Sequence, residues 1–209
     1  MARLMARSQR APASLTPQAP SRAQALRERV AEAIVAAAAE VFARDGAGAG
    51  MAEVATAAGV ARATVYRYFP TRKALLERLA AVAVEDAGAR LADARLEEVD
   101  AEEGVTRGVR ALLEVGDYFT VLARERIRPD DEDYEERLIA PLRRLFEQGQ
   151  SKGVFREDIP SEWLTNALFD LVVSVVASMP GFGRDNTVAA VSSLFLDGVR
   201  APSTGRSSA

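Results

Sequence analysis

The stretch that decides the fold runs from Met51 to Leu76 and reads MAEVATAAGVARATVYRYFPTRKALL. Its apolar residues recur at helical spacing in two short segments, 51–58 and 62–68, and Gly59 opens the turn between them. The second segment must end before Pro70, because a residue that precedes proline is disfavoured in the α-helical conformation. Two short helices joined by a tight turn are typical of a helix-turn-helix unit.

Longer helical patterns flank this unit on both sides. The preceding pattern begins at Ser21, which has capping-box spacing to Gln24, and ends at Gly46, where glycine favours a helix stop. The following pattern begins after Thr71, a residue type that caps helices, and continues to about Leu96. Helical spacing then recurs over 104–123, 134–152, 163–178 and 186–199. Because no segment shows the alternation of a strand, we expect an all-α protein of about nine helices.

The composition excludes several classes of protein. The chain contains no cysteine and no histidine, which rules out disulfides, zinc sites built on those residues, cysteine nucleophiles and Ser-His-Asp triads. Its longest apolar stretch, 171–179, is too short to span a bilayer. We therefore expect a cytoplasmic protein that binds no membrane, holds no metal or cofactor and is not an enzyme.

The distribution of charge separates the chain into two parts. The whole chain carries a net charge of −3, but residues 1–78 hold 12 basic and six acidic residues, a net charge of +6. The remainder therefore carries −9. Such asymmetry indicates that the basic part meets a polyanion, so the helix-turn-helix part is the candidate DNA-binding region.

A helical wheel of the second motif helix separates a core face from a DNA face. Val65 and Phe69 lie within about 40° of each other and face the core, whereas Ala63 and Arg67 point the opposite way. Arg67 is the best candidate for reading a guanine, because its planar guanidinium can bond two base acceptors at once. Ala63 can contact the methyl group of a thymine. Arg62, at the start of the helix, can reach either base edges or backbone.

Several further side chains suit the phosphate backbone. The hydroxyl groups of Thr64, Tyr66 and Tyr68, on the flanks of the wheel, can bond phosphate oxygens, although packing explains the two tyrosines equally well. Arg72 and Lys73 open the next helix, where free backbone amides already favour phosphate.

The run 51–76 resembles the DNA-binding segment of the TetR family, whose pattern reads roughly I-A-x-x-A-G-V-S-x-x-T-[LV]-Y-x-[HY]-F-x-[ST]-K-x-x-L. The residues that fit this pattern are Ala55, Ala58, Gly59, Val60, Thr64, Tyr66, Tyr68, Phe69, Thr71 and Leu75. The specific match covers about 30–79, and the rest of the chain resembles the family in its helical architecture alone. The resemblance favours a phosphate contact over a packing role for both tyrosines.

Three positions depart from the family pattern. Gly50 stands at a predicted DNA-contacting position where the family often has a Ser or Thr that caps the helix and bonds a phosphate. Ala61 replaces the usual Ser cap of the recognition helix, a loss of about 0.5–2 kcal/mol of helix stability. Arg72 replaces the usual Lys and keeps the charge. Individual phosphate contacts are thus in question, but the motif is intact.

The resemblance implies a homodimeric repressor that binds a near-palindromic operator and is released by a small, apolar effector. It divides the chain into a disordered basic tail (1–20), a DNA-binding domain (21–78, motif 50–69), an effector-binding and dimerisation domain (79–200) and a disordered tail (201–209). The last two helices would form a four-helix bundle with those of the partner. The expected interface residues are Leu164, Leu168, Leu171, Val172, Val175, Val188, Val191 and Phe195. The expected effector-pocket residues are Tyr118, Phe119, Leu122, Phe146 and Trp163.

Other interpretations remain open at this stage. A helical enzyme or lipid carrier could use acids such as Glu114 and Asp117, and an interaction module could carry a vestigial head; both predict no specific DNA binding. The acidic run 130–136 lacks the spacing of a calcium loop and is interpreted as a solvated helix start. Arginines of the N-terminal segment, Arg3, Arg7, Arg10 and Arg22, form either a disordered tail or an arm that reaches the minor groove.

Overall fold

The computed structural model describes residues 21–46, 49–125, 127, 132–178 and 181–202. The predicted tail 1–20 and residues 203–209 of the second tail lie outside this described part. Within it, every regular element is a helix, apart from one isolated antiparallel bridge between Phe155 and Arg200. The expectation of an all-α fold is confirmed.

The helices follow one another along the chain with short connections. They are α1 (Arg22–Asp45), α2 (Met51–Ala57), α3 (Arg62–Tyr68), α4 (Arg72–Asp93), the 3-10 turn η2 (Leu96–Glu98), α5 (Ala101–Glu114), α6 (Gly116–Arg124), α7 (Glu132–Tyr134), η3 (Glu135–Ile139), α8 (Ala140–Ser151), α9 (Ser161–Ser178) and α10 (Arg184–Val199). Because α7, η3 and α8 form one continuous helix, the described residues contain nine helices besides η2, as predicted.

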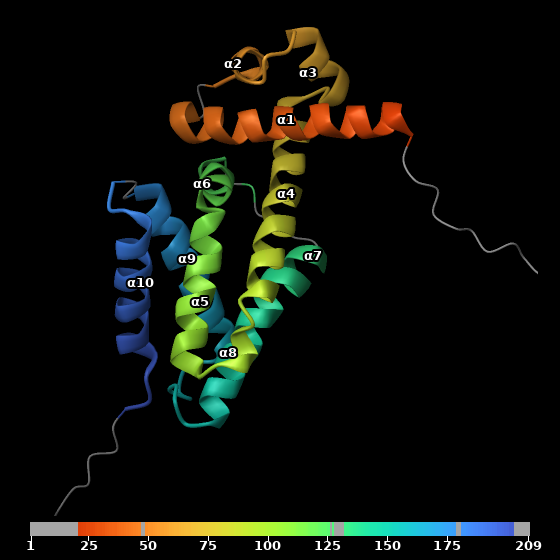
Figure 1. Cartoon of the computed structure of the whole chain (residues 1–209). Helices are drawn as coiled ribbons and strands as arrows, with labels where there is room; N and C mark the ends of the chain where they lie inside the picture. Colours follow the sequence, from red (N-terminus) through yellow and green to blue (C-terminus); the bar gives the residue numbers. More distant parts are fainter. Residues whose placement is uncertain (1–20, 47–48, 126, 128–131, 179–180, 203–209) are drawn as a thin grey trace, which may run out of the picture.

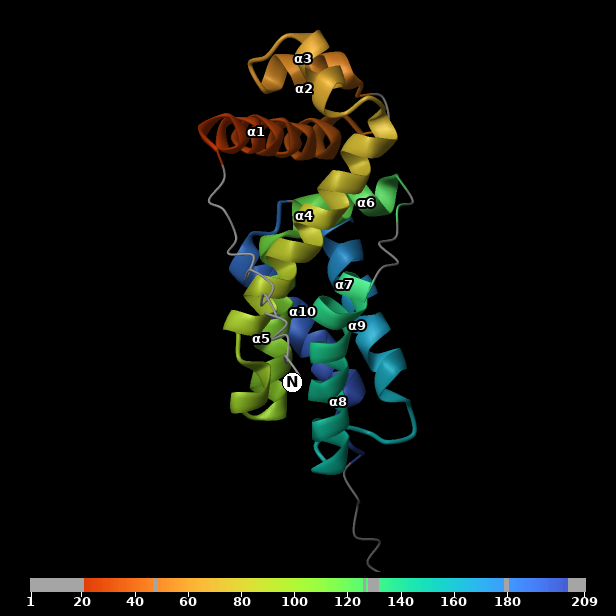
Figure 2. The same ribbon diagram turned by 90° about the vertical axis from the view of Figure 1, so that its right-hand side faces the viewer.

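The molecule has a small head at one end and a helical body below it (Figure 1). In the head, α2 and α3 lie above α1, which crosses the top of α4. The long helix α4 descends from the head along the body, and α6 lies directly beneath α1 (Figures 1 and 2). The head is thus connected to the body through α4 along the chain and through α6 in space.

Local sequence explains where the head helices begin and end. The Ser21 hydroxyl accepts a hydrogen bond of 3.2 Å from the Gln24 amide, which starts α1. Gly46 ends the same helix with a φ of 66°, and Gly59 makes the turn between α2 and α3 with a φ of 65°. Both conformations lie in the left-handed region that favours glycine. The predicted limits of α3 agree with the structure, and α2 ends within one residue of its prediction.

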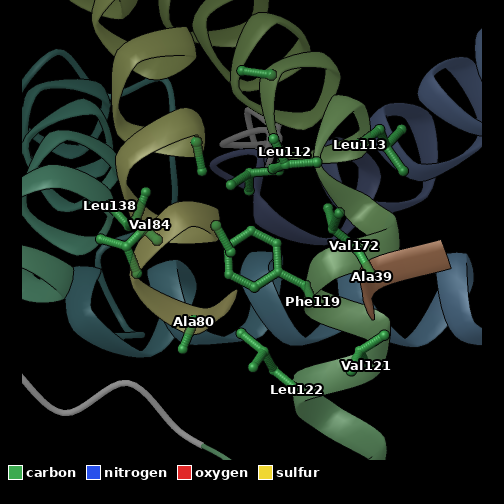
Figure 3. Packing of buried hydrophobic residues seen from close by; sticks show 14 of the residues in the cluster. Ala39, Ala80, Val84, Leu112, Leu113, Phe119, Val121, Leu122, Leu138 and Val172 are labelled. Carbon is green, nitrogen blue, oxygen red and sulfur yellow. The ribbon is translucent and has the colours of Figure 1, made fainter. Parts of the chain in front are cut away.

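The core of the body lies between α4, α6, α8 and α9. Figure 3 shows the Phe119 ring of α6 pointing among Val84 of α4, Leu112 of α5 and Leu138 of the helix that precedes α8. These residues are all at most 5% exposed. Apolar burial of this kind supplies the main free energy that holds α6 against the rest of the body.

The body departs from prediction at one helix break. The sequence pattern predicted a single helix over 104–123, but the chain divides there into α5 and α6 at Val115. Gly116 begins α6 so close to α9 that an added Cβ would lie 2.8 Å from a methyl carbon of Val176. Helical periodicity cannot reveal such a break, because it is produced by packing between segments distant in sequence.

A widened turn accommodates Pro141. Proline has no N–H to donate and its ring crowds the preceding turn of a helix. In the segment η3, just before it, the Ala140 N–H bonds to the carbonyl of Glu135, five residues back, in place of the usual four. The predicted helix over 134–152 therefore persists through the proline with a local π turn.

Among the helices of the described residues, none is both long enough and apolar enough to cross a membrane.

Candidate nucleic-acid interface

The recognition helix α3 presents the face that the sequence predicted. Val65 is fully buried and Phe69 is 7% exposed, and both belong to the core that holds α3 against the head. Arg62, Ala63, Tyr66 and Arg67 are exposed, while Thr64 and Tyr68 are half-buried. Figure 2 shows α3 at the outermost end of the head, away from the body. The polar side chains of α3 are therefore free to enter a groove.

Two arginines of α3 are ordered by neighbouring tyrosines. The Arg62 guanidinium lies 5.5 Å from the centroid of the Tyr66 ring and donates a hydrogen bond of 3.4 Å to its hydroxyl. This hydrogen bond raises the pKa of Arg62 above its ordinary value. Arg67 lies 5.4 Å from the centroid of the Tyr68 ring. Stacking of this kind restricts the long side chains before DNA arrives, which reduces the entropy lost on binding.

The N-termini of α2 and α3 lack side-chain caps, as the sequence predicted. Gly50 has no side chain and the side chain of Ala61 has no acceptor, so neither residue accepts a side-chain hydrogen bond from its helix. At α2, however, the Glu53 carboxylate accepts a hydrogen bond of 3.0 Å from the Gly50 amide. This is the second half of a capping box, and the spacing from Gly50 to Glu53 is the sequence signal that identifies it.

Arg72 pairs with a carboxylate of the body, so the phosphate contact predicted for it stays a prediction that competes with this pairing. Its two terminal nitrogens donate hydrogen bonds of 2.6 and 2.8 Å to the carboxylate of Glu125, directly after α6. Its guanidinium also lies 4.6 Å from the centroid of the Phe42 ring of α1. The pairing raises the pKa of Arg72 and lowers that of Glu125, because each charge favours the other. Proximity in the tertiary structure, invisible in the sequence, redirects this side chain.

Lys73 keeps the exposed position that a phosphate contact requires. Its side chain is 83% exposed, and its only described ion pair is with Glu77, one turn along α4, at 3.5 Å. Such an exposed pair within one helix is worth about 0.3–0.5 kcal/mol and is easily given up to a phosphate.

The predicted dimer residues lie mostly inside the chain. Six of the eight, Leu164, Leu168, Val172, Val188, Val191 and Phe195, are at most 7% exposed in the single chain. They pack against the chain's own core, so they cannot also be the surface of an interface. Within the single chain these apolar stripes are already covered, that of α9 by α6 and α8 and that of α10 by α5. Only Leu171 and Val175 remain partly accessible.

The predicted effector-pocket residues do not converge. Phe119 and Leu122 point to the core between α4 and α6 (Figure 3), and the Phe119 ring lies edge-on to Phe169 at 5.2 Å. Phe146 belongs to a different cluster with Phe155 and Phe195. Trp163 is 71% exposed on α9 and lines no interior surface. Tyr118 is half-buried against the core.

Among the open surface grooves on the described part of the body, the two best defined contain no predicted pocket residue. One, of about 520 Å³, lies between the end of α4 and α8, and the other, of about 370 Å³, lies between α4 and α5. Glu114, a residue of the rival acid–base interpretation, lines the second groove and pairs with Arg90. In the part of the chain that the structure describes, no group of acidic side chains is placed to hold a metal ion.

Comparison with known proteins agrees with this geometry. Residues 34–79, from the middle of α1 to the first half of α4, match the model of the tetR family of bacterial regulatory proteins. A tetR-family regulatory protein from Rhodococcus RHA1 is 22% identical, with a TM-score of 0.70 over 83% of this chain and 98% of its own. The TetR-like regulator LfrR from Mycobacterium smegmatis, solved with proflavine, is 26% identical, with a TM-score of 0.68 over 83% and 97%. RolR, solved with resorcinol, is 22% identical, with a TM-score of 0.57 over 85% and 91%. No curated protein matches the chain in sequence.

Residues 34–79 are thus similar to the DNA-binding segment of the tetR family, and the chain shares its fold with solved TetR-like regulators. Both the segment and the fold are those of DNA-binding regulators of transcription, a class of proteins that are not enzymes. Sequence reasoning missed two residues of the head and its surroundings. Glu53 had a signal, namely its capping-box spacing to Gly50. Glu125 had none, because it lies between the predicted helices 104–123 and 134–152.

Proposed function

We propose that the protein is a ligand-responsive repressor that binds a near-palindromic operator as a homodimer and leaves it when a small, apolar effector binds the body. The observation that carries the proposal is the exposed face of α3, where Arg62, Ala63 and Arg67 stand outward while Val65 is fully buried. Arg67 reads a base, and Thr64, Tyr66, Tyr68 and Lys73 contact the backbone.

The outward faces of α9 and α10 support the homodimer. Small side chains form part of these faces, namely Ala167, Ser174, Ala189, Ala190 and Ser193. Leu194 stands among those of α10 with 67% exposure. Small residues allow helices to approach closely, and an exposed leucine gains apolar burial when a partner covers it. These exposed positions replace the buried ones as the proposed contact surface, together with Leu171 and Val175.

The interior of the body supports an apolar effector. Among the described residues, the buried polar side chains carry hydroxyl groups alone: Thr120, Thr165, Thr187 and Ser192. An effector with a net charge would lose its hydration there without gaining a counter-ion. The Phe169 ring contacts the rings of Phe119 and Tyr134 edge to face, and such aromatic surfaces suit a flat ring. LfrR and RolR, which share this fold, were solved with the small molecules proflavine and resorcinol, which supports a small-molecule effector.

The DNA-binding part of the proposal is tested with duplexes selected from a random pool by the wild-type protein. We expect a near-palindromic consensus, and Arg67→Ala should lower discrimination at one base pair per half-site by about 1–3 kcal/mol. Arg110→Ala is the matched control, because Arg110 is an exposed arginine of α5, outside the head. Selection of no consensus, or equal loss with both variants, would contradict the proposal.

A further inference from the structure

The contact between Arg72 and Glu125 differs from the other ion pairs of the described residues in burial. The side chain of Glu125 is 13% exposed, whereas the next least exposed carboxylate in an ion pair, that of Glu114, is 32% exposed. The Arg72–Glu125 pair joins residues 53 positions apart, one at the start of α4 and the other just after α6. The hydrogen bonds are bidentate, a geometry that fixes both position and orientation.

A second polar contact joins the end of α6 to the head. Arg124, the last residue of α6, donates a hydrogen bond of 2.8 Å to the backbone carbonyl of Ala43 in α1. The Phe42 ring beside it carries the Arg72 guanidinium on its face at 4.6 Å. The end of α6 is therefore joined to α1, which packs against α2, and to α4, which follows α3 in the chain (Figure 1).

The recognition helix is connected to this contact by a short and stiff segment. Only Phe69, Pro70 and Thr71 separate α3 from Arg72. Phe69 is buried, proline fixes its own φ, and the Thr71 hydroxyl accepts a hydrogen bond of 3.0 Å from the Ala74 amide. A shift of the first turn of α4 must therefore displace the end of α3.

We propose that the Arg72–Glu125 pair is a positioning contact that sets the orientation of the recognition helix, so that Glu125, a residue outside the DNA-binding head, determines affinity for DNA. The inference rests on DNA binding by α3, and it goes beyond the proposed function in assigning part of that binding to the end of α6.

The competing assignment is that Arg72 leaves Glu125 and binds a phosphate. That exchange would leave the Glu125 carboxylate, which is 13% exposed, without its partner. It would also remove the Arg72 guanidinium from the face of the Phe42 ring. A charge that is partly buried and loses its partner is strongly disfavoured. The structure therefore favours a pair that persists in the DNA complex.

The test compares Arg72→Ala, Arg72→Lys, Glu125→Gln and the double variant Arg72→Ala/Glu125→Gln on the selected duplex at several salt concentrations. We expect each single variant to weaken binding by roughly tenfold, within the usual range of coupling between sites. The double variant should be no weaker than either single one, because both remove the same contact. The slope of log affinity against log salt should stay unchanged, because no phosphate contact is lost. Arg72→Lys should fail to restore binding, since lysine cannot form the bidentate pair.

The opposite pattern would overturn the inference. If Arg72 binds a phosphate, Arg72→Ala lowers the salt slope by about one, Arg72→Lys binds like the wild type, and Glu125→Gln binds as tightly or more tightly. Thermal unfolding of every variant, followed by circular dichroism, keeps misfolding separate from a loss of orientation. The exchanged variant Arg72→Glu/Glu125→Arg tests whether an ion pair restored in the reverse order also restores binding to the duplex. A wild-type protein that selects no duplex would contradict the proposed function itself, whereas a normal wild type with an unaffected Glu125→Gln contradicts this inference alone.

Discussion

At the scale of single residues, the position on α3 decides the role of each side chain. Val65 is fully buried while Arg67, two positions later, is exposed, so a helix of seven residues separates packing from recognition. This separation follows from helical geometry alone, which is why the wheel predicted it. Arg72 shows the limit of such reasoning, because Glu125 reaches it from a distant segment.

The missing cap of α3 gives a prediction for residue 61. Ala61 is exposed and has an extended backbone, with φ −66° and ψ 145°, which is the conformation of a helix-capping residue. We expect Ala61→Ser to raise the free energy of unfolding by about 0.5–2 kcal/mol, since its hydroxyl would accept a free amide of α3. Urea denaturation measures the change. Ala63→Ser, inside the same helix, serves as the control and should stabilise nothing; an equal gain in both variants would sink the capping explanation.

At the scale of elements, the helices that carry the site were predicted and the junction that positions them was not. Caps and glycines placed α1 to α4, because their signals lie within a few residues of each helix end. The break at Val115 depends on close packing against α9, and the contact of Arg124 with Ala43 joins residues 81 positions apart, so no local pattern encodes either.

The contact between α8 and the following loop gives a prediction for two glycines. A Cβ added at Gly149 would collide with the ring of Phe155, which is fully buried. We expect Gly149→Ala to lower the free energy of unfolding by about 1–3 kcal/mol, because the ring has no free space into which to move. At Gly198 of α10 a Cβ meets no atom within 4 Å, so Gly198→Ala should be neutral or stabilising by up to about 1 kcal/mol. Chemical denaturation of both variants checks the pair, and a tolerated Gly149→Ala would show that the packing is looser than described.

At the scale of the whole molecule, the charge and the surface composition differ between the head and the body. The head carries the positive charge that a polyanion requires, while the rest of the chain is acidic. The last two helices carry few charges for their length: α9 contains Glu162 and Asp170, and α10 contains Arg184, Asp185 and Asp197. Few charges there lower the cost of removing water when a second copy packs against these helices.

The proposed dimer gives a prediction for Leu194. Leu194→Asp should yield monomers, because two copies would bury an unpaired carboxylate in place of a leucine. Light scattering after size-exclusion chromatography measures the mass in solution. Leu26→Asp is the matched control, since Leu26 is similarly exposed, at 63% against 67%, but lies on α1. A dimer that survives Leu194→Asp, or a wild type that is monomeric, would contradict the proposed interface.

The sequence by itself determined the helix-turn-helix, its exposed and buried faces, the resemblance to the TetR family and the all-α architecture. Each depends on residues close together along the chain, where helical period, caps and turns act. The tertiary structure decided what distant segments do to one another. It turned Arg72 towards Glu125, buried Leu168 and Val191 within the chain, and left Trp163 and Leu194 outside. The reason is physical: an apolar stripe or a charged side chain specifies that it needs a partner, but only the folded chain specifies which partner it finds.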